Sequence, residues 1–559
     1  MRTGAFRYVL ILSLTAACSR QVATTAWPTV TLTRPPQGSP TFTLVPTPSP
    51  TPSTTAAPSP IPTSTATSTP VPAATPTLTA TPLPSPTATL EPLATAELTS
   101  VPPPTDVPGN WVDCSTFLAT GLVPGGTNGW WTDQDAELWR ARYAELQPQI
   151  VRLPVLQWRL EPANDDDDPT HINWAAFHFD DPVPLPVGGL TLTYRKWFEM
   201  LRGLDVAVMF YIPYLADWLS TNSEDRPYGT YPPRSMAEYG EFVEAVLRFL
   251  VEQVRYPPER IIVEAVNEPD LGCGRDPAVP CFWRDQTMAD LVEVVRAARK
   301  AADAVDPAIR VVGLSECCGT GLTRDLLDNY GGKALLDGLT YHYYTPDSDF
   351  GVGLERGRSL LEYNKPVYIN EYGSTAYWSD GQEGALWHSY VLPLLWREGI
   401  SPVQFSLSEF PGMHEGYNRL GLMRGWEHNW DAKPAYSVYA GFFRHMGPTV
   451  PVSSTVQTPL IVAAGLGSGA RPGGLAGDSY AAVWVVNIAE DDQLGVAFRV
   501  RGFPSAVAQV TVYDVLAGDV PVDAFQVRGA PLAFAYNLPA RSVHVFELAT
   551  RHELSGVGE

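Results

Sequence analysis

The stretch Ile261-Ile-Val-Glu-Ala-Val-Asn-Glu-Pro-Asp270 is a short apolar run that reaches a glutamate, Glu268, and breaks at the proline that follows. A second stretch, Lys365-Pro-Val-Tyr-Ile-Asn-Glu-Tyr-Gly373, has the same form and carries Glu371. Short runs rich in β-branched residues that end at Pro or Gly are typical of buried strands. We therefore expect each glutamate to lie where a buried strand ends, at the mouth of a core.

Similar apolar runs alternate with helix-like stretches from residue 109 to residue 446. The expected strands are Gln149–Val155, Val206–Ile212, Ile261–Val266, Ile309–Leu314, Gly338–Tyr343, Val367–Asn370 and Val403–Leu407, with an eighth, less regular strand near Asp113–Thr120. Helices are expected between them, for example over Met236–Val254 and Met288–Ala304. Eight strands that alternate with helices predict the α/β class and a (β/α)8 TIM barrel. In that fold the active site lies at the C-terminal ends of the strands, where both glutamates fall.

The pattern changes after Gly447, where short strands separated by Gly, Pro and Asp replace the helix-sized segments. The expected strands are Ser479–Asn487, Val496–Val500, Gln509–Tyr513 and Ser542–Leu548. Such a series predicts a small all-β sandwich over residues 447–551. We expect this domain to brace the barrel, and carbohydrate binding is the alternative role.

Residues 19–108 form a segment dominated by proline and threonine. From Pro28 to Pro108, 22 of the 81 residues are Pro and another 22 are Thr, while only four residues are charged. Such a composition cannot bury enough apolar surface to offset the entropy lost on ordering. The segment is therefore predicted to be a disordered Pro/Thr-rich linker.

Residues 1–18 have the pattern of an export signal peptide. Arg2 and Arg7 form a basic region before an apolar run, Tyr8–Leu14, that is too short to span a bilayer. Thr15-Ala-Ala-Cys18 follows and is similar to a bacterial lipoprotein box, although Thr15 stands where Leu is usual. We expect lipidation at Cys18 and a location outside the cell or at its surface, with the lipid as anchor in a bacterial membrane. Secretion without an anchor is the alternative.

The other five cysteines suit an oxidising compartment. Cys273 and Cys281 bracket a short loop and are the candidate disulfide, and a bridge from Cys114 to Cys317 or Cys318 is also open. None of the spacings matches a zinc site, and we expect neither a metal nor a cofactor. The net charge of -22 argues against nucleic acid as a partner.

Three motifs accompany the two glutamates. They are Val266-Asn-Glu-Pro-Asp-Leu271 followed by Phe282-Trp283, then Tyr341-His-Tyr-Tyr344, and then Ile369-Asn-Glu-Tyr-Gly373. In this order they resemble the acid/base segment, the sixth-strand motif and the nucleophile segment of clan A glycoside hydrolases. Within the clan they resemble family 39 most, and family 5 is the alternative. The resemblance covers residues 110–446, and Phe405–Phe410 departs from it because Trp is frequent in the clan at that strand.

The resemblance implies a role for each residue of the motifs. A retaining glycosidase holds two carboxyl groups about 5 to 5.5 Å apart, one protonated to release the leaving group and one ionised to attack. We assign Glu268 as the general acid/base and Glu371 as the nucleophile. Asn267 is expected to bind the sugar 2-hydroxyl, while Tyr344 and Arg152 hold Glu371 ionised. His342 is either a substrate ligand or a satisfied barrel histidine.

Aromatic residues on the expected loops are further candidates for substrate binding, because pyranose rings stack on flat aromatic faces. Tyr211, Trp283 and Trp378 follow expected strands, as do Tyr214 and Trp218. The alternative for each of them is ordinary loop packing.

Other acidic residues have simpler interpretations. Glu264 is expected to be the buried partner of another residue, and Glu316 a strand-end carboxylate without a catalytic role. The run Asp165-Asp-Asp-Asp168 lacks the spacing and the turn glycine of a known calcium loop, so it is expected to be a solvated acidic turn.

These inferences predict an exported glycoside hydrolase that cleaves β-linked glycans by double displacement, with a carbohydrate as its substrate. The lipid anchor would be its only contact with a membrane. The alternative is a catalytically inactive surface protein that binds glycans.

Overall fold

The computed structural model describes residues 110–550 except 120, 129–135, 167, 183–192, 222–230, 272–285, 410–418, 426–427, 456–458 and 469–478. The predicted export signal, Cys18, the predicted linker, Cys273, Cys281 and Trp283 lie outside the described residues. Within the described part of the chain, no helix combines the length and the apolar character needed to cross a membrane.

Eight parallel strands form a closed barrel, which confirms the predicted (β/α)8 architecture. They are β2 (Gly126–Asn128), β3 (Ile150–Pro154), β4 (Ala207–Tyr211), β5 (Ile261–Glu264), β6 (Arg310–Glu316), β7 (Gly338–Thr345), β8 (Val367–Ser374) and β9 (Ile400–Gln404). Each strand pairs with the next along the chain, and β9 closes the barrel onto β2. All residues of β3, β4 and β5 are buried, because helices cover the outside of the barrel while side chains fill its inside. This double burial explains the continuous apolar runs in the sequence.

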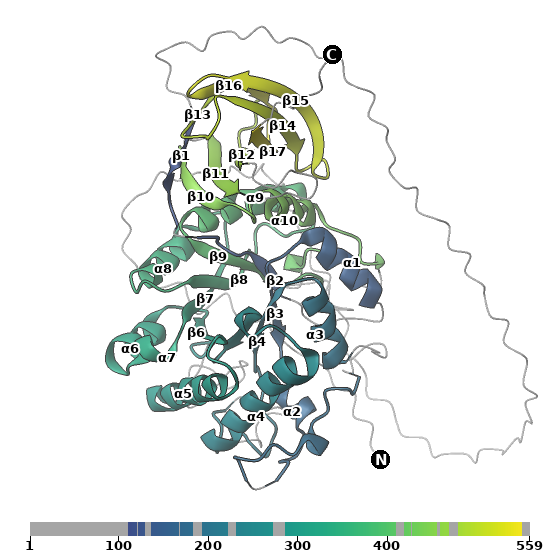
Figure 1. Cartoon of the computed structure of the whole chain (residues 1–559), viewed down its shortest axis with the longest axis vertical. Coiled ribbons are helices and arrows are strands. Elements are labelled where there is room, and N and C mark those ends of the chain that lie inside the picture. Colours follow the sequence, from purple (N-terminus) through teal and green to yellow (C-terminus); the bar gives the residue numbers. More distant parts are fainter. Residues whose placement is uncertain are drawn as a thin grey trace, which may run out of the picture. The chain divides into compact units, whose positions relative to one another are not determined.

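Helices surround the barrel (Figure 1). They are α1 (Ala136–Leu146), α2 (Gln157–Leu160), α3 (Tyr194–Gly203), α4 (Met236–Arg248), α5 (Met288–Val305), α6 (Gly321–Asn329), α7 (Gly332–Leu335), α8 (Gly351–Leu361), α9 (Gln382–Arg397) and α10 (Pro434–His445), with 3-10 turns at Trp174–Ala176 and Pro258–Arg260. The helix predicted over Met236–Val254 is α4 and the π-helical turn Phe249–Val254 that continues it. The second predicted helix is α5, which begins with a capping box between Thr287 and Asp290.

One apolar layer fills the barrel at the end away from the predicted site. Six of the eight strands contribute to it: Ile150, Ala207, Met209, Ile262, Val312, Tyr368 and Val403. Such layers make the barrel interior a packed core, and they leave the C-terminal ends of the strands for the chemistry.

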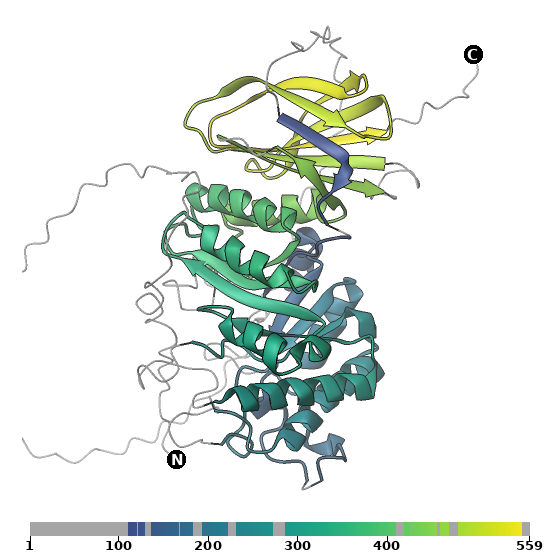
Figure 2. The same ribbon diagram turned by 90° about the vertical axis from the view of Figure 1, so that its left-hand side faces the viewer.

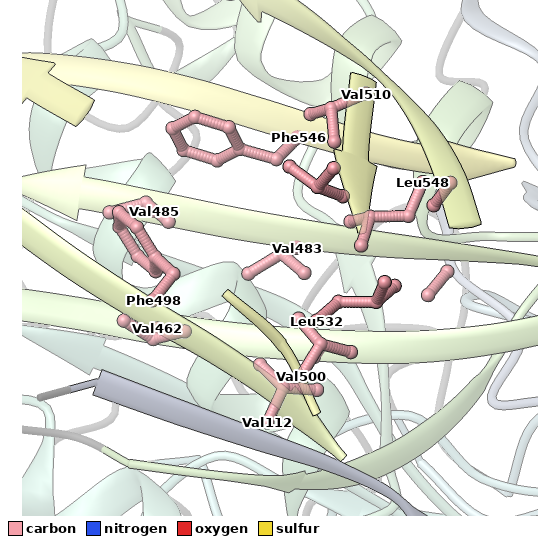
Figure 3. Close-up of a cluster of buried hydrophobic side chains, with 14 of the residues drawn as sticks. Val112, Val462, Val483, Val485, Phe498, Val500, Val510, Leu532, Phe546 and Leu548 are labelled. Atoms are coloured by element: carbon pink, nitrogen blue, oxygen red, sulfur yellow. The ribbon is translucent and has the colours of Figure 1, made fainter. Parts of the chain in front are cut away.

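The C-terminal domain is an all-β sandwich, as predicted. Its sheet contains β10 (Val450–Ser454), β11 (Leu460–Ser468), β12 (Ser479–Asn487), β13 (Gln493–Arg501), β14 (Val507–Asp514), β15 (Val520–Arg528), β16 (Leu532–Leu538), β17 (Ser542–Thr550) and β1 (Asn110–Phe117). Buried aliphatic and aromatic side chains fill its centre, and Val483, Phe498 and Phe546 lie among them (Figure 3).

The predicted barrel strand near Asp113–Thr120 is wrong. This segment is β1, which pairs antiparallel with β10 and parallel with β13 and so lies in the sandwich (Figure 2). The first barrel strand is β2, which is three residues long and starts at Gly126. A Cβ atom at Gly126 would lie 2.0 Å from the backbone oxygen of Ile150, so the close strand approach requires glycine. A strand this short has no apolar periodicity to detect.

Helices α9 and α10 connect the barrel to the sandwich. The Trp484 indole of β12 donates a 3.1 Å hydrogen bond to the backbone oxygen of Ser389 on α9, and its ring packs edge-on against Phe442 of α10. At the end of α10, His445 contacts two sandwich carboxylates, Asp519 and Glu547. The sandwich is therefore held to the barrel by buried polar contacts as well as by aromatic packing.

Candidate active site

Both predicted catalytic glutamates lie at the C-terminal end of the barrel. Glu371 is part of β8, and Glu268 follows the end of β5 at Glu264. Glu268 is 8% exposed and Glu371 is 6% exposed, so each side chain is largely removed from water. Parallel strands all end at the same rim, which is why residues 103 positions apart meet here.

The backbone at Glu268 adopts an uncommon conformation. Its φ of 47° lies in the left-handed region, which costs a residue with a side chain about 1 kcal/mol or more. The N–H group of Glu268 donates to the backbone oxygen of Ser315 in β6 at 3.2 Å, which fixes this turn. Such conformations cluster at functional sites, where they direct a side chain that regular structure would point elsewhere.

An irregularity in strand pairing directs the second glutamate. Tyr341 of β7 pairs with Ile369 of β8, but His342 already pairs with Glu371, so Asn370 is an extra residue in β8. A bulge of this kind changes the direction of the side chains that follow it. Glu371 therefore lies directly beside His342 on the neighbouring strand.

The two carboxyl groups lie close together around His342. One carboxyl oxygen of each glutamate and a ring nitrogen of His342 all lie within 4.8 Å of one another. The Nδ1 atom of His342 is 2.9 Å from Oε1 of Glu268 and 3.6 Å from Oε2 of Glu371. Because burial lowers the pKa of His342, the imidazole is neutral near pH 7 and does not neutralise both carboxyl groups.

Arg152 supplies the positive charge of the site. Its Nη1 group donates to Oε1 of Glu371 at 2.6 Å, while Nε and Nη2 bind the two carboxylate oxygens of Glu264 at 2.5 and 2.7 Å. Burial alone would lower the pKa of Arg152, but Glu264 and Glu371 raise it overall, so the guanidinium stays charged. The structure places Glu264 as the buried partner of this arginine.

Three more residues hold the guanidinium in place. It donates to the side-chain oxygens of Asn128 at 2.9 Å and Asn267 at 2.6 Å, and it lies over the ring of Tyr211 at 3.8 Å. Tyr211 is fully buried, so its ring supports Arg152 and is not an exposed platform. Since the oxygen of Asn267 accepts from Arg152, its amide nitrogen is the donor that remains.

Tyr344 provides the other contact to Glu371. Its hydroxyl group donates to Oε2 of Glu371 at 2.8 Å, so each carboxylate oxygen of Glu371 accepts a hydrogen bond. The Tyr344 ring meets Phe405 edge-on, with 5.9 Å between the ring centres. Phe405 follows β9, at the strand where the sequence departs from the clan pattern.

The two glutamates differ in their electrostatic environment. Burial raises the pKa of Glu268 to about 8, the charge of Asp270 adds to this rise, and Arg152 opposes it. The pKa of Glu371 is also raised above its ordinary value, because burial and the charge of Glu268 outweigh the lowering effects of Arg152 and the Tyr344 hydroxyl. Glu268 therefore holds a proton near neutral pH, whereas Glu371 has the donors that favour its ionised form.

Another predicted aromatic residue, Trp378, lies on the loop after β8. It is half-buried, and the guanidinium of Arg419 lies 5.0 Å from its ring centre. The part of the chain that the structure describes shows no direct contact between Trp378 and either glutamate. Trp283 and its loop fall in the range 272–285, outside the described residues.

Sequence reasoning missed several residues that organise the site. Asn370 donates to both Glu264 and Ser315, and Asn128 donates to the backbone oxygen of Asn370. Asp270 raises the pKa of Glu268 and accepts the backbone N–H groups of Cys317 and Cys318. Asn370 and Asp270 belong to the motifs quoted above, so the sequence could have indicated them. Asn128 lies on a strand of only three residues, and no sequence pattern marks it.

Glu316 has a structural role. Its carboxylate accepts the backbone N–H groups of Leu322 and Thr323 at 3.0 and 2.7 Å, at the start of helix α6. A carboxylate at this place satisfies free helix donors. This agrees with the expectation that Glu316 is not catalytic.

Side chains that could together hold a metal ion gather at three places among the described residues. They are Glu268, His342 and Glu371 in the candidate active site, Asp270 with Cys317 and Cys318 beside it, and Glu161, Asp165 and Glu241 elsewhere. In the active site, Arg152 already provides a positive charge to Glu371.

The proposed bridge from Cys114 is not formed. Cys114 is buried in β1 of the sandwich and is not part of a disulfide, because β1 lies away from the loop after β6 that carries Cys317 and Cys318. The sulfur atoms of Cys317 and Cys318 lie 2.9 Å apart.

Comparisons with known proteins test the fold. No protein-family model matches the chain, and neither does any curated protein. Among solved structures, a glucosidase from Croceicoccus marinus is 14% identical with a TM-score of 0.56, and the match covers 80% of this chain and 100% of that one. A glycoside hydrolase family 30 subfamily 8 xylanase from Clostridium acetobutylicum is 12% identical with a TM-score of 0.57, covering 79% and 100%.

A family 39 enzyme from Xanthomonas axonopodis pv. citri is 16% identical with a TM-score of 0.51, and the match covers 79% of this chain and 97% of that one. These identities are too low to carry activity from one protein to another. The chain therefore has the fold of clan A glycoside hydrolase structures, with family 39 among them, as its motifs led us to expect.

Proposed function

We propose that this protein is a retaining glycoside hydrolase that acts on β-linked glycans. The observation that carries the proposal is the separation of Glu268 and Glu371, whose nearest carboxyl oxygens lie within 4.8 Å. Retaining enzymes hold their carboxyl groups about 5 to 5.5 Å apart, whereas inverting enzymes leave about 6.5 to 9.5 Å for a water molecule. The separation therefore fits the retaining class and lies below the range of the inverting class.

In the first step of the proposed reaction, a carboxylate oxygen of Glu371 attacks the anomeric carbon. The bond from that carbon to the leaving oxygen breaks, and Glu268 transfers its proton to the leaving oxygen. The environment of each residue suits its role, because Glu268 has a pKa of about 8 while Arg152 and Tyr344 hydrogen-bond Glu371. The product is a glycosyl ester on Glu371.

In the second step, the deprotonated Glu268 takes a proton from water as the water oxygen attacks the anomeric carbon. The ester bond to Glu371 breaks, and the sugar leaves with its original configuration. Asn267 is held by Arg152 through its oxygen, so its amide nitrogen is free to donate to the sugar 2-hydroxyl. A hydrogen bond there strengthens as charge develops on the sugar ring.

Turnover by the purified full chain tests the proposal. We would offer a panel of aryl β-glycosides and β-linked polysaccharides to the wild type, Glu371→Gln and Glu316→Gln, and follow the anomer released first by NMR. Release of the β-anomer by the wild type and Glu316→Gln, with none from Glu371→Gln, supports the proposal. Initial release of the α-anomer contradicts retention. Binding of a glycan without any turnover supports the inactive glycan-binding protein.

We further propose that the protein is exported and held at the cell surface by a lipid on Cys18. The basic start, the short apolar run and the cysteine after Thr15-Ala-Ala support this proposal. A hydrolase so placed would act on extracellular glycans.

A further inference from the structure

Three carboxylates gather outside the candidate active site. Glu161 directly follows the end of α2, Asp165 lies in the loop beyond it, and Glu241 is on α4. One oxygen from each of the three lies within 4.8 Å of the others. The loops after β3 and β4 bring them together, so the cluster lies on the same face of the barrel as the active site.

The two glutamates of this cluster are buried and incompletely bonded. Glu161 is 1% exposed and Glu241 is 4% exposed. The Oε2 atom of Glu161 accepts from Gln157 at 3.2 Å, but the Oε1 atoms of both glutamates are buried and have no hydrogen-bond partner. The side-chain oxygen of Asn164, next to Asp165, is also buried without a partner. Each of these buried oxygens therefore has lone pairs that no hydrogen-bond donor among the described residues uses.

In the described parts of the chain, none of the three carboxylates of this cluster forms an ion pair with Lys, Arg or His. Buried charges of like sign without a counter-charge are costly. Burial and the neighbouring carboxylates accordingly raise the pKa of Glu161 to about 8 and that of Glu241 to about 9.

We propose that Glu161, Asp165 and Glu241 bind a calcium ion. Carboxylate and amide oxygens are the ligands of hard cations, and the donor set contains no nitrogen or sulfur. Calcium–oxygen distances of about 2.3 to 2.6 Å place ligands on opposite sides of the ion about 4.6 to 5.2 Å apart, which accommodates the 4.8 Å limit here. Magnesium needs about 2.0 to 2.1 Å and a strict octahedron, which ligands from a loop and a separate helix meet less readily.

Asp165 also stabilises the conformation of its own loop. Its two carboxylate oxygens accept the backbone N–H groups of Asp166 and Asn173 at 2.8 and 2.7 Å, and each retains a lone pair for an ion. Two other described residues of the run bond locally, Asp166 to His171 and Asp168 to Thr170. Among the described members of the acidic run, Asp165 alone joins the cluster, and its partners Glu161 and Glu241 lie outside the run.

The ion would link the loops after β3 and β4 at the rim of the candidate active site. The backbone oxygen of Glu161 accepts a 3.1 Å hydrogen bond from the indole of Trp218, on the loop after β4. Gln157 of α2 accepts the backbone N–H of Ala216 in the same loop. Because β3 carries Arg152 and β4 carries Tyr211, these loops border the residues that position Glu371.

Calorimetry and thermal unfolding of the full chain, stripped with EGTA and titrated with calcium chloride, test the proposal. We expect one ion per chain with a Kd below about 1 mM and a rise in Tm when calcium is added. Glu161→Gln and Glu241→Gln should each weaken binding at least about tenfold. Asp168→Asn, in the exposed part of the same acidic run, should bind calcium as the wild type does.

The glutamine variants distinguish a metal site from a merely structural carboxyl. Glutamine keeps the size of glutamate and removes a buried carboxylate that has no ion-pair partner among the described residues. The Tm in EGTA should therefore stay unchanged or rise, and a loss of stability should appear only when calcium is present. A second readout is terbium luminescence excited through tryptophan, which Trp218→Phe should reduce while calcium binding persists.

Several results would overturn the proposal. One is the absence of calcium heat and of any Tm shift in the wild type. Another is unchanged calcium affinity in Glu161→Gln and Glu241→Gln. A third is loss of binding in Asp168→Asn alone, which would place the ion on the exposed turn.

Discussion

Arg152 and Glu264 form a two-pronged ion pair, with contacts of 2.5 and 2.7 Å, and both side chains are fully buried. The pair binds no substrate atom directly in the proposed reaction. It fixes the guanidinium so that the remaining Nη1 group reaches Glu371 at 2.6 Å. Arg152 therefore orients Glu371, the proposed nucleophile, and Glu264 in turn holds Arg152 in place.

Replacing this arginine tests its positioning role. Arg152→Lys keeps the charge but cannot reach Glu264 with two donors and Glu371 with a third, so we expect kcat/KM to fall by at least about a hundredfold. Arg152→Met should also lower the free energy of unfolding by about 3 to 5 kcal/mol, because it leaves two buried carboxylates without their counter-charge. Steady-state kinetics and urea unfolding measure the two effects. Arg248→Lys, at a half-buried pair with Glu244 on the outside of α4, should change neither by much.

The pKa of Glu268 predicts the alkaline side of the pH profile. The general acid must be protonated in the free enzyme, so kcat/KM should fall as the pH rises through about 8. Asp270→Asn removes a charge that raises this pKa and should move the fall to lower pH. A profile of kcat/KM from pH 4 to 10 measures both. An alkaline limb that stays in place in Asp270→Asn would contradict the assigned cause.

Removal of the acid/base side chain should affect substrates unequally. Glu268→Ala should slow a glycoside with a poor leaving group by about 10² to 10⁴-fold, while an activated aryl glycoside still forms the ester on Glu371. Azide can then enter the vacated space and restore turnover, giving a glycosyl azide of retained configuration. Product analysis by NMR decides the roles, since an azide of inverted configuration would identify Glu268 as the nucleophile.

His445 predicts how stability depends on pH at the junction of barrel and sandwich. Burial alone would lower its pKa, but the contacts with Asp519 and Glu547 raise it overall. Because the pKa of His445 is higher in the folded protein, its contacts stabilise the fold fully at a pH below the pKa of an unfolded histidine, about 6.5. This stabilisation is lost as the pH rises through the pKa of His445 in the folded protein. The difference in unfolding free energy between the wild type and His445→Gln should therefore shrink from pH 5.5 to pH 9. Urea unfolding at several pH values measures it.

The lipid anchor gives a prediction for intact cells. Cys18→Ala removes the sulfur atom that would carry the lipid, so the protein should move from the membrane fraction to the soluble fraction. Fractionation followed by immunoblotting of the full chain measures this. Equal partition of the wild type and the variant would favour secretion without an anchor.

The barrel strands could be predicted because parallel strands covered by helices are apolar along their whole length. β3 to β9 each carry such a run, but the short β2 does not. The regular strand β1 was therefore placed in the wrong sheet, since its own residues do not show which strands it pairs with. That information lies in β10 and β13, more than 330 residues further along the chain.

The catalytic pair could also be predicted, because each glutamate stands in a motif at a strand end. The residues that tune it were harder to find. The link from Glu264 through Arg152 to Glu371 joins three strands, and no short stretch of sequence contains it. The same holds for Glu161 and Glu241, which lie 80 positions apart. Short-range patterns identify the reacting groups, whereas their partners depend on tertiary contacts.

The position of β1 has a mechanical consequence. The chain enters the described structure at Asn110, in a strand flanked on both sides by β10 and β13. A pulling force on the preceding segment would thus be resisted by the hydrogen bonds of an inner strand of the sandwich, before any load reached the barrel. The barrel lies in the chain between β1 and β10, so the sandwich would take up the strain of a tether while Glu268 and Glu371 keep their spacing.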